Sequence, residues 1–306
     1  MTAPQAVSGN PFVVSAPDPS LPLSIRGMSK AYEGKAVLDA LDLDVPAGTV
    51  LGLLGRNGAG KSTLMECALG LRGMELGQAR LFGEDAMQLT DATRARLGYV
   101  PQDSGIFEWM TAGQLLEYFA SFYPRWNTAK VDMLLARWGI ERNKSINKMS
   151  GGQKQRLSII RALAPDPELL VLDEPVAALD PAGRRDFLRE LVDSVERGTT
   201  IIFSTHILTD LERIAMDVAF LREGKISVQA PLDELIDQAR RVTGPASVLT
   251  GKMPRTVLSS QRLPDGQLSA VVQVDSRSEA ELANLVPQGV RIDRVGLEDL
   301  FVELTQ

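Results

Sequence analysis

The chain has 306 residues, of which 44% are hydrophobic and 24% charged, which is ordinary globular composition and enough for one large domain with an appendage or for two modest domains. Its formal net charge of −6 argues against sequence-independent electrostatic binding to nucleic acid, which requires a basic face. The single cysteine excludes an intramolecular disulfide and suits a reducing compartment, and no run approaches the roughly 18 apolar residues of a membrane span.

The N-terminal segment, residues 1–21, is expected to be a flexible, extended tail. It is rich in proline and contains no lysine or arginine, so we do not read it as a secretory signal. Residues 23–54 then predict a succession of strands, because polar and apolar side chains alternate over Asp39–Leu43. Pro46-Ala47-Gly48 predicts the turn before the last of these strands.

The stretch GRNGAGKST, from Gly55 to Thr63, fits the phosphate-binding pattern G-x-x-x-x-G-K-[ST] without mismatch. It follows the apolar run of residues 50–54 and precedes a helix predicted over Lys61–Leu71, which is the context that the pattern requires. The glycines let backbone N–H groups approach phosphate oxygens, and the helix N-terminus adds a favourable dipole. Lys61 is expected to reach the β- and γ-phosphates of a nucleotide, and Ser62 to offer its hydroxyl to Mg²⁺.

Residues 103–149 predict a mostly helical insertion. They contain all 3 tryptophans of the chain, and apolar side chains recur at helical spacing over residues 115–122 and 131–138. The sequence Pro-Arg-Trp-Asn at residues 124–127 interrupts this pattern, and Asn127 is expected to cap the helix that follows.

The octapeptide MSGGQKQR, residues 149–156, predicts a second anion site. Ser150 is suited to cap a helix over Gly151–Ala164, and Gly151 and Gly152 leave the first turn of that helix bare. The N–H groups and the dipole of this turn would then face outward. Such a site has no evident purpose unless a further phosphate reaches it.

The segment LLVLDEP, residues 169–175, predicts a buried parallel strand that ends in Asp173 and Glu174. The carboxyl ends of strands are where open α/β sheets bind ligands. Asp173 is expected to hold Mg²⁺ through water, and Glu174 to orient or deprotonate an attacking water molecule. Taken alone, the segment is also compatible with a strand that ends in a solvated acidic turn.

The remaining pattern predicts further α/β units and then a small α+β appendage. Leu297, Leu300, Phe301 and Leu304 give a closing amphipathic helix. The other predicted elements are a helix over 182–196, a strand over Thr199–Phe203, a helix over Leu208–Ala215, a strand pair that turns at Glu223-Gly224, a helix over Leu232–Arg241, strands near Val257, Ala270–Val274 and Val290–Ile292, and a hairpin turn at Pro264-Asp265-Gly266.

This ordered set of motifs resembles the ATP-binding subunits of ABC transporters over residues 22–230. The resemblance implies an α/β P-loop NTPase cassette over residues 22–231, with a RecA-like core, an antiparallel β subdomain and a helical subdomain, and a small C-terminal α+β domain over residues 232–306. It rests on GRNGAGKST as Walker A, Gln102 in GYVPQD as the Q-loop, MSGGQ as the signature, LLVLDEP as Walker B, AALD (177–180) as the D-loop, His206 in FSTH as the switch histidine, and Tyr32 at the place of an adenine-stacking aromatic residue.

The resemblance also implies ATP and Mg²⁺, and a role for each matching position. In the family, two cassettes meet head to tail, so that the signature of one closes over the ATP held by the other; Ser150, Gly152 and Gln153 would act there in trans, while Asp180 would communicate across the dimer. The implied nucleotide-binding residues are Tyr32, Gly55, Asn57, Gly58, Ala59, Gly60, Lys61, Ser62, Thr63, Ser150, Gly152, Gln153 and Asp180; the implied catalytic residues are Glu174, His206 and Gln102; the implied metal ligands are Ser62, Gln102 and Asp173.

The sequence departs from the family pattern at several positions. Met149 replaces the usual leucine of the signature, an exchange between side chains of similar volume. Val176-Ala177-Ala178 replaces the common Thr-Ser-Gly, which removes hydroxyl contacts across the dimer and puts the coupling between the two sites in doubt. Tyr32 is also compatible with an ordinary tyrosine of a core or a sheet edge.

The resemblance implies a cytoplasmic ATPase subunit, peripheral on the inner face of the cell membrane, that works with an integral membrane permease and a second, identical cassette. The ending VGLEDLFVELTQ and the segment FYPRW resemble exporter-type subunits, which favours export over import. Side chains of the insertion could contact the permease, and packing beneath the insertion is the equal alternative. These side chains are Ile106, Phe107, Trp109 and Met110.

The sequence also bears on two other classes of ABC protein. A soluble ABC protein acting on ribosomes or nucleic acid is the main alternative, although the chain has one cassette, no heptad run and no cysteine pair, and no nucleic acid partner is expected. A regulatory cassette that binds ATP without hydrolysing it is disfavoured by the presence of Glu174 and His206.

Overall fold

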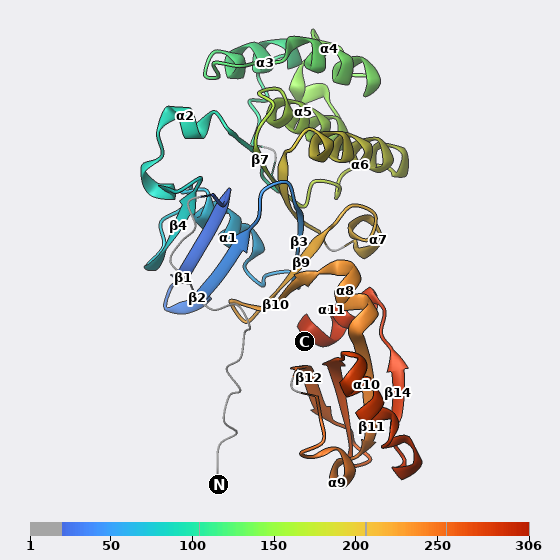
Figure 1. Cartoon of the computed structure of the whole chain (residues 1–306). Coiled ribbons are helices and arrows are strands. Elements are labelled where there is room, and N and C mark those ends of the chain that lie inside the picture. The colour runs from blue at the N-terminus through green and yellow to red at the C-terminus, as the bar shows by residue number, and fades with distance from the viewer. Residues whose placement is uncertain (1–19, 104, 206, 255, 306) are drawn as a thin grey trace.

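The computed structural model describes residues 20–103, 105–205, 207–254 and 256–305. At its centre is a six-stranded sheet of order β10-β9-β3-β8-β7-β6, in which β10 is the antiparallel edge strand and the others run parallel (Figure 1). The strands of this sheet are β3 (Val50–Leu54), β6 (Leu97–Val100), β7 (Leu169–Asp173), β8 (Thr200–Ser204), β9 (Asp217–Arg222) and β10 (Lys225–Pro231).

The parallel pairing of the central sheet decides where the functional residues gather. Strands β3, β8 and β7 are adjacent and are buried along their whole length, as strands covered on both faces are. Their carboxyl ends, at Leu54, Ser204 and Asp173, therefore meet at one edge of the sheet.

A four-stranded antiparallel sheet of order β2-β1-β4-β5 packs beside the central sheet, with α1 contributing to the shared core (Figure 1). Leu51 and Leu53 of β3 contact the same apolar cluster as Ile25 and Leu64, so the two sheets hold α1 between them. These elements are β1 (Leu23–Tyr32), β2 (Lys35–Val45), β4 (Leu76–Leu81), β5 (Glu84–Asp85) and α1 (Lys61–Ala68).

Over its described residues, the predicted insertion contains two α-helices, α3 and α4, which lie at the end of the molecule opposite the C-terminal sheet (Figure 1). Asn127 caps the second of them, as predicted, by accepting a hydrogen bond from the Lys130 N–H at 2.9 Å. Among the described residues, no helix is both long enough and apolar enough to cross a membrane. The helices between β5 and β9 are η1 (Ala86–Gln88), α2 (Asp91–Arg94), α3 (Ala112–Ala120), α4 (Thr128–Arg137), η2 (Ile146–Lys148), α5 (Gly151–Leu163), α6 (Pro181–Glu196) and α7 (Leu208–Leu211).

A second four-stranded antiparallel sheet, of order β12-β13-β11-β14, forms the C-terminal part of the chain (Figure 1). Leu300 and Leu304 of the closing helix join the same apolar cluster as Phe220 of β9, so this part packs directly on the central sheet. Its predicted boundary at residues 231 and 232 stays a prediction. The elements are α8 (Leu232–Gln238), β11 (Ala239–Pro245), α9 (Ala246–Leu249), β12 (Thr256–Arg262), β13 (Gln267–Gln273), α10 (Ser276–Ala283), η3 (Val286–Gln288), β14 (Arg291–Arg294) and α11 (Leu297–Thr305).

Three predicted helices are shorter than the sequence pattern indicated. The helix expected over Lys61–Leu71 ends at Ala68, and Gly70, with a φ of 68°, follows its end. The helix expected over Leu232–Arg241 ends at Gln238, because the following residues pair with β13 on one side and β14 on the other. The helix expected over Leu208–Ala215 ends at Leu211. There the Met216 N–H donates to the carbonyl of Val50 at 2.9 Å, which draws the chain into the sheet as β9.

A buried carboxylate in α6 ties the insertion to the core. Glu190 is 2% exposed, and its oxygens lie 3.3 Å from a guanidinium nitrogen of Arg137 and 3.6 Å from one of Arg197. Burial nevertheless raises the pKa of Glu190 above its ordinary value. The contribution of this group to stability is therefore fully present below its ordinary pKa and is lost as the pH rises through the raised pKa.

We expect Glu190→Gln to leave the free energy of unfolding at pH 8 within about 1 kcal/mol of the parent, because the substitution removes a desolvated charge while both arginines remain partly exposed. Urea unfolding followed by circular dichroism between pH 5 and 8 measures this, and the variant should lose less stability than the parent over that range. A loss of about 3 kcal/mol or more at pH 8 would show that the ion pairs outweigh desolvation.

Candidate active site

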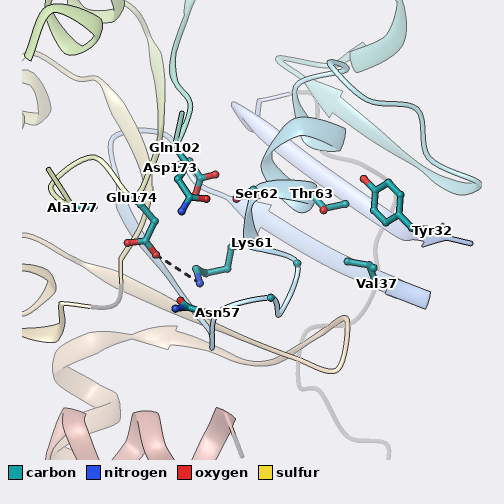
Figure 2. A pocket seen from close by; sticks show the side chains of 12 residues that line it. Tyr32, Val37, Asn57, Lys61, Ser62, Thr63, Gln102, Asp173, Glu174 and Ala177 are labelled. Carbon is teal, nitrogen blue, oxygen red and sulfur yellow. Dashed lines mark ion pairs between the residues drawn. The ribbon is translucent and has the colours of Figure 1, made fainter. Parts of the chain in front are cut away.

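A cavity of about 580 Å³ opens at the carboxyl edge of the central sheet. Figure 2 shows side chains from β7, from the loop after β3 and from the start of α1 converging on it. Its lining residues are Tyr32, Val37, Asn57, Gly58, Gly60, Lys61, Ser62, Thr63, Gln102, Asp173, Glu174 and Ala177.

The loop after β3 presents the bare N-terminus of α1 to this cavity. Gly60 is the residue before the helix, with a φ of 103° that L side chains rarely adopt, so only glycine is unstrained there. A Cβ on Gly60 would also lie 3.0 Å from Cγ1 of Val37, which forms the wall of the cavity on the β2 side. The helix end therefore has no capping side chain, and its N–H groups and dipole are available to an anion.

Lys61 places a buried cation in the cavity wall. Its side chain is 7% exposed, and its Nζ donates to the carbonyl oxygens of Gly55 at 2.9 Å and Arg56 at 3.3 Å. The same Nζ lies 3.8 Å from Oε1 of Glu174 (Figure 2). The two carbonyl oxygens and this carboxylate compensate the buried charge, and the cavity beside the ammonium group leaves room for phosphate oxygens.

The two carboxylates at the end of β7 are positioned by the neighbouring strand. Asp173 is almost fully buried, and its Oδ1 accepts a hydrogen bond from the Ser204 hydroxyl at 2.6 Å. The same hydroxyl accepts the backbone N–H of Glu174 at 2.9 Å. Glu174 has a φ of 49°, an unusual backbone conformation for a residue that is not glycine, and this turn directs its carboxylate toward Lys61 (Figure 2).

The remaining cavity residues differ in how deeply they lie. Gln102 is exposed at the start of the loop after β6 and points to the same space as Asp173 and Ser62 (Figure 2). Tyr32 lies on the opposite side of the cavity at the end of β1, with its side chain 38% exposed. Lys30 Nζ and Arg72 Cζ lie 5.4 and 5.6 Å from the centre of its ring. An accessible aromatic ring of this kind can stack on a base, and the edge-tyrosine alternative is equally compatible with its exposure.

The signature residues do not line the cavity of their own chain. Ser150 and Gln153 form a capping box at the start of α5: the Ser150 Oγ accepts from the Gln153 N–H, and Gln153 Oε1 accepts from the Ser150 N–H, both at 3.3 Å. The predicted cap at Ser150 is therefore confirmed. The expected bare first turn is found at Gly151, whereas a Cβ on Gly152 would lie 2.9 Å from the Ala178 carbonyl oxygen, so this glycine is needed for close packing.

Most of the predicted Walker A, Q-loop and Walker B residues line the cavity. Gly55, Ala59 and Asp180 do not. Gly55 contributes its carbonyl to Lys61, and Ala59 closes the loop through a 3.1 Å bond from its N–H to the Arg56 carbonyl. Asp180 lies outside the cavity at the start of α6, and its Oδ1 accepts the Gly183 N–H at 3.2 Å. His206, the predicted switch histidine, lies outside the described residues.

Sequence reasoning missed several residues of this region. Ser204 was part of the quoted FSTH segment, but only its proximity to β7 reveals the hydrogen bonds to the carboxylate pair. Val37 lines the cavity, as does Ala177, which was expected only as part of the D-loop, and Arg156, three residues after Gln153, pairs with Asp180. No local pattern indicates these contacts, because each depends on residues that are distant in the chain.

Comparison with known proteins gives consistent matches. A family model described as ABC transporter matches residues 38–177. The daunorubicin resistance ATP-binding protein DrrA3 of Streptomyces coeruleorubidus is 30% identical over 301 residues, covering 92% of this chain and 95% of that protein. The Nod factor export ATP-binding protein I of Paraburkholderia xenovorans is 32% identical over 303 residues, covering 94% of this chain and 98% of that protein. A solved ATP-binding subunit of an ABC transporter aligns with a TM-score of 0.64 at 28% identity, covering 70% of this chain and 92% of that one.

The hydrogen bonds of Ser204 allow the positioning of Asp173 and Glu174 to be tested. We expect Ser204→Ala to lower the rate of ATP turnover about 10- to 100-fold with little change in ATP affinity, because the hydroxyl orients both acidic residues without lining the cavity. Steady-state turnover and equilibrium binding of a fluorescent ATP analogue measure the two effects. Ser194→Ala is the matched control, since it removes another buried serine hydroxyl, bonded to the Glu190 carbonyl. Equal losses in both variants would contradict a role for Ser204 at this site.

Proposed function

The chain belongs to the ATP-binding proteins of the ABC transporter family and is an ATPase, and we propose that it powers the export of a substrate through a separate integral membrane subunit. The observation that carries the ATP-binding and hydrolysis part of the proposal is the cavity at the carboxyl edge of the sheet. There the buried Lys61 cation, the bare N-terminus of α1 and the oriented carboxylates Asp173 and Glu174 face the same space.

The loop after β3 would bind the phosphates of ATP. The N–H groups at Gly58, Gly60 and the first turn of α1 would donate to phosphate oxygens, and the Lys61 ammonium group would move its interactions from the Gly55 and Arg56 carbonyls to the β- and γ-phosphates. Tyr32 would stack on the adenine from the opposite side of the cavity.

The metal and the attacking water would lie between α1 and β7. Ser62, Gln102 and Asp173 all line this part of the cavity and offer oxygen ligands, which Mg²⁺ prefers. Bound Mg²⁺ would neutralise charge that develops on the phosphates. Glu174 would accept a hydrogen bond from the attacking water or take its proton, and the ammonium group of Lys61, 3.8 Å from its Oε1, would help to hold this carboxylate in place. His206 is proposed to contact the γ-phosphate.

The signature helix supports a site shared between two chains. Ser150, Gly152 and Gln153 do not line the cavity of their own chain, and the first turn of α5 is exposed at Ser150 and Gly151. A second, identical cassette arranged head to tail would place this helix N-terminus against the γ-phosphate held by its partner. Asp180, at the start of α6, would lie near the same interface.

The direction of transport is inferred from the relatives. One matched protein is named for daunorubicin resistance and another for Nod factor export, and each match extends over more than nine-tenths of this chain, including its C-terminal part. Export is consistent with both names. On this proposal the chain acts in the cytoplasm at the inner face of the membrane, because ATP is supplied there.

The insertion carries an exposed aromatic cluster that is suited to the membrane subunit. We define this cluster as Phe107, Trp109, Tyr118 and Phe122, in which successive ring centres lie 5.0 to 5.6 Å apart. Trp109 is 77% exposed and Phe122 62% exposed. Aromatic side chains of this exposure are typical of protein interfaces. Of the four side chains first considered, Ile106 is buried and Phe107 and Met110 are partly buried against the main apolar cluster, so Trp109 is the exposed one.

We expect Glu174→Gln to lower ATP turnover by at least about 100-fold while ATP binding is retained, because the variant removes the group that activates water and preserves its size. The variant should also accumulate as a dimer with ATP in size-exclusion chromatography. Glu168→Gln is the matched control, because it changes a half-exposed glutamate at the other end of the same strand and should leave turnover unchanged. Parent-like turnover of Glu174→Gln would show that the catalytic assignment is wrong.

The partner is tested by affinity purification of the tagged Glu174→Gln chain, with ATP, from detergent-solubilised membranes of the source cells. We expect a protein with several membrane-spanning helices to co-purify, and Trp109→Ala in the same background to reduce its recovery about tenfold or more, because exposed aromatic anchors dominate interfaces. Met216→Ala, which truncates a half-exposed side chain elsewhere, should leave recovery unchanged. Recovery of ribosomes or nucleic acid without a membrane protein would favour the soluble alternative.

A further inference from the structure

The loop between β7 and α6, residues 174–180, joins the catalytic carboxylate to the D-loop aspartate. Its backbone is compact: the Ala177 N–H donates to the Glu174 carbonyl at 3.2 Å, and the Leu179 N–H donates to the Val176 carbonyl at 3.1 Å. The side chains of Val176 and Leu179 are buried in the main apolar cluster. Glu174 and Asp180 therefore stand at the two ends of a short, anchored segment.

The first turn of the signature helix packs against this loop. A Cβ on Gly152 would lie 2.9 Å from the Ala178 carbonyl oxygen, a separation that real Cβ atoms essentially never show. Any side chain at residue 152 would push the loop and α5 apart. The glycine thus allows a direct backbone contact between the signature and the loop that carries Glu174.

One turn further along α5, Arg156 makes a second contact with the same loop. Its NH2 group donates to Oδ1 of Asp180 at 2.6 Å, the oxygen that also caps α6 through the Gly183 N–H. The guanidinium lies directly over the first turn of α6, since a Cβ on Gly183 would approach it to 2.3 Å. Nε of Arg156 is buried without a hydrogen-bond partner among the described atoms, so the carboxylate of Asp180 is the charge that compensates this largely desolvated cation.

We infer that Arg156 is a positioning residue for ATP hydrolysis, which fixes the loop of Glu174 and Asp180 to the signature helix of the same chain. The inference rests on the proposed function, in which each chain presents its signature to the nucleotide of its partner. In the proposed dimer, the contact between Arg156 and Asp180 fixes the distance between two parts of one chain. These parts are its own Glu174 and the signature residues that it presents to the nucleotide of its partner. Val176-Ala177-Ala178 has no hydroxyl that could make this connection, and Arg156 supplies it from the neighbouring helix.

The test is a double-substitution cycle on the purified full-length chain, read as kcat for ATP and as the dissociation constant of a fluorescent ATP analogue. Arg156→Gln should lower kcat about tenfold or more and leave ATP affinity unchanged, because Arg156 does not line the cavity and its loss misplaces Glu174. Asp180→Asn should lower kcat to a similar extent, since asparagine can still cap α6 but carries no charge. The double variant should be no slower than the slower single variant.

Control substitutions separate this role from a general loss of stability. Arg142→Gln removes an ion pair of the same 2.6 Å length, with Asp132, and should leave kcat at the parent value. Arg156→Lys should restore part of the lost rate because it keeps the positive charge. Thermal unfolding of each variant identifies any that fail to fold; if Arg156→Gln is among them, Arg156→Lys takes its place in the cycle with Asp180→Asn.

Several outcomes would overturn the inference. Parent-like kcat in Arg156→Gln or in Asp180→Asn, additive losses in the double variant, or an equal loss in Arg142→Gln each exclude a positioning role. If Glu174→Gln abolishes turnover while Arg156→Gln retains it, only this inference fails. If both variants turn over ATP like the parent, the proposed active site fails as well.

Discussion

The ammonium group of Lys61 lies inside the protein, where only its immediate neighbours can stabilise its charge. Two backbone carbonyls and the Glu174 carboxylate surround it, and the groups that create this environment come from distant parts of the chain. The glycine-rich loop must bend sharply to offer its carbonyls, β7 must end where Glu174 can face the lysine, and α1 must begin without a capping side chain. A cavity built in this way is prepared for phosphate before any ligand arrives.

Parallel strand pairing satisfies this constraint. Because β3, β8 and β7 run in the same direction and are neighbours, the loop that holds Lys61, the hydroxyl of Ser204 and the Walker B carboxylates reach one edge of the sheet together. The hydroxyl of Ser204 then links β8 to β7 through two hydrogen bonds, in addition to the backbone hydrogen bonds between these strands. The antiparallel sheet completes the cavity from the other side, with Val37 against Gly60 and Tyr32 at the rim. The two sheets therefore contribute different walls of the same cavity.

A second set of contacts extends from the cavity toward the insertion. The loop after Glu174 touches the signature helix at Gly152 and at Arg156, and α6 meets α4 through Glu190 and Arg137. The exposed aromatic cluster lies on the same insertion. These packed helices and ion pairs connect the proposed hydrolysis site with the surface proposed for the membrane subunit, without a flexible linker between them.

The sequence by itself determined the features whose chemistry is local. The glycine pattern before Lys61, the apolar strand that ends in Asp173 and the caps at Ser150 and Asn127 each depend on residues that are neighbours in the chain, and the structure confirms those elements and both caps. Local patterns also account for most of the strands and helices of the two sheets that frame the site. The roles assigned to individual side chains in catalysis remain predictions, because they require a bound nucleotide and a second chain.

Only the tertiary structure decided the features that depend on contacts between distant residues. Residues 239–241 carry a helical pattern, yet they form β11 because β13 and β14 offer hydrogen-bond partners on both sides. Likewise, nothing beside Ser204 or Arg156 in the chain indicates their partners, which are brought to them by β7 and α6. The physical reason is the same in each case: a local pattern reports the intrinsic preference of a segment, whereas burial and pairing energies depend on what the rest of the fold places against it.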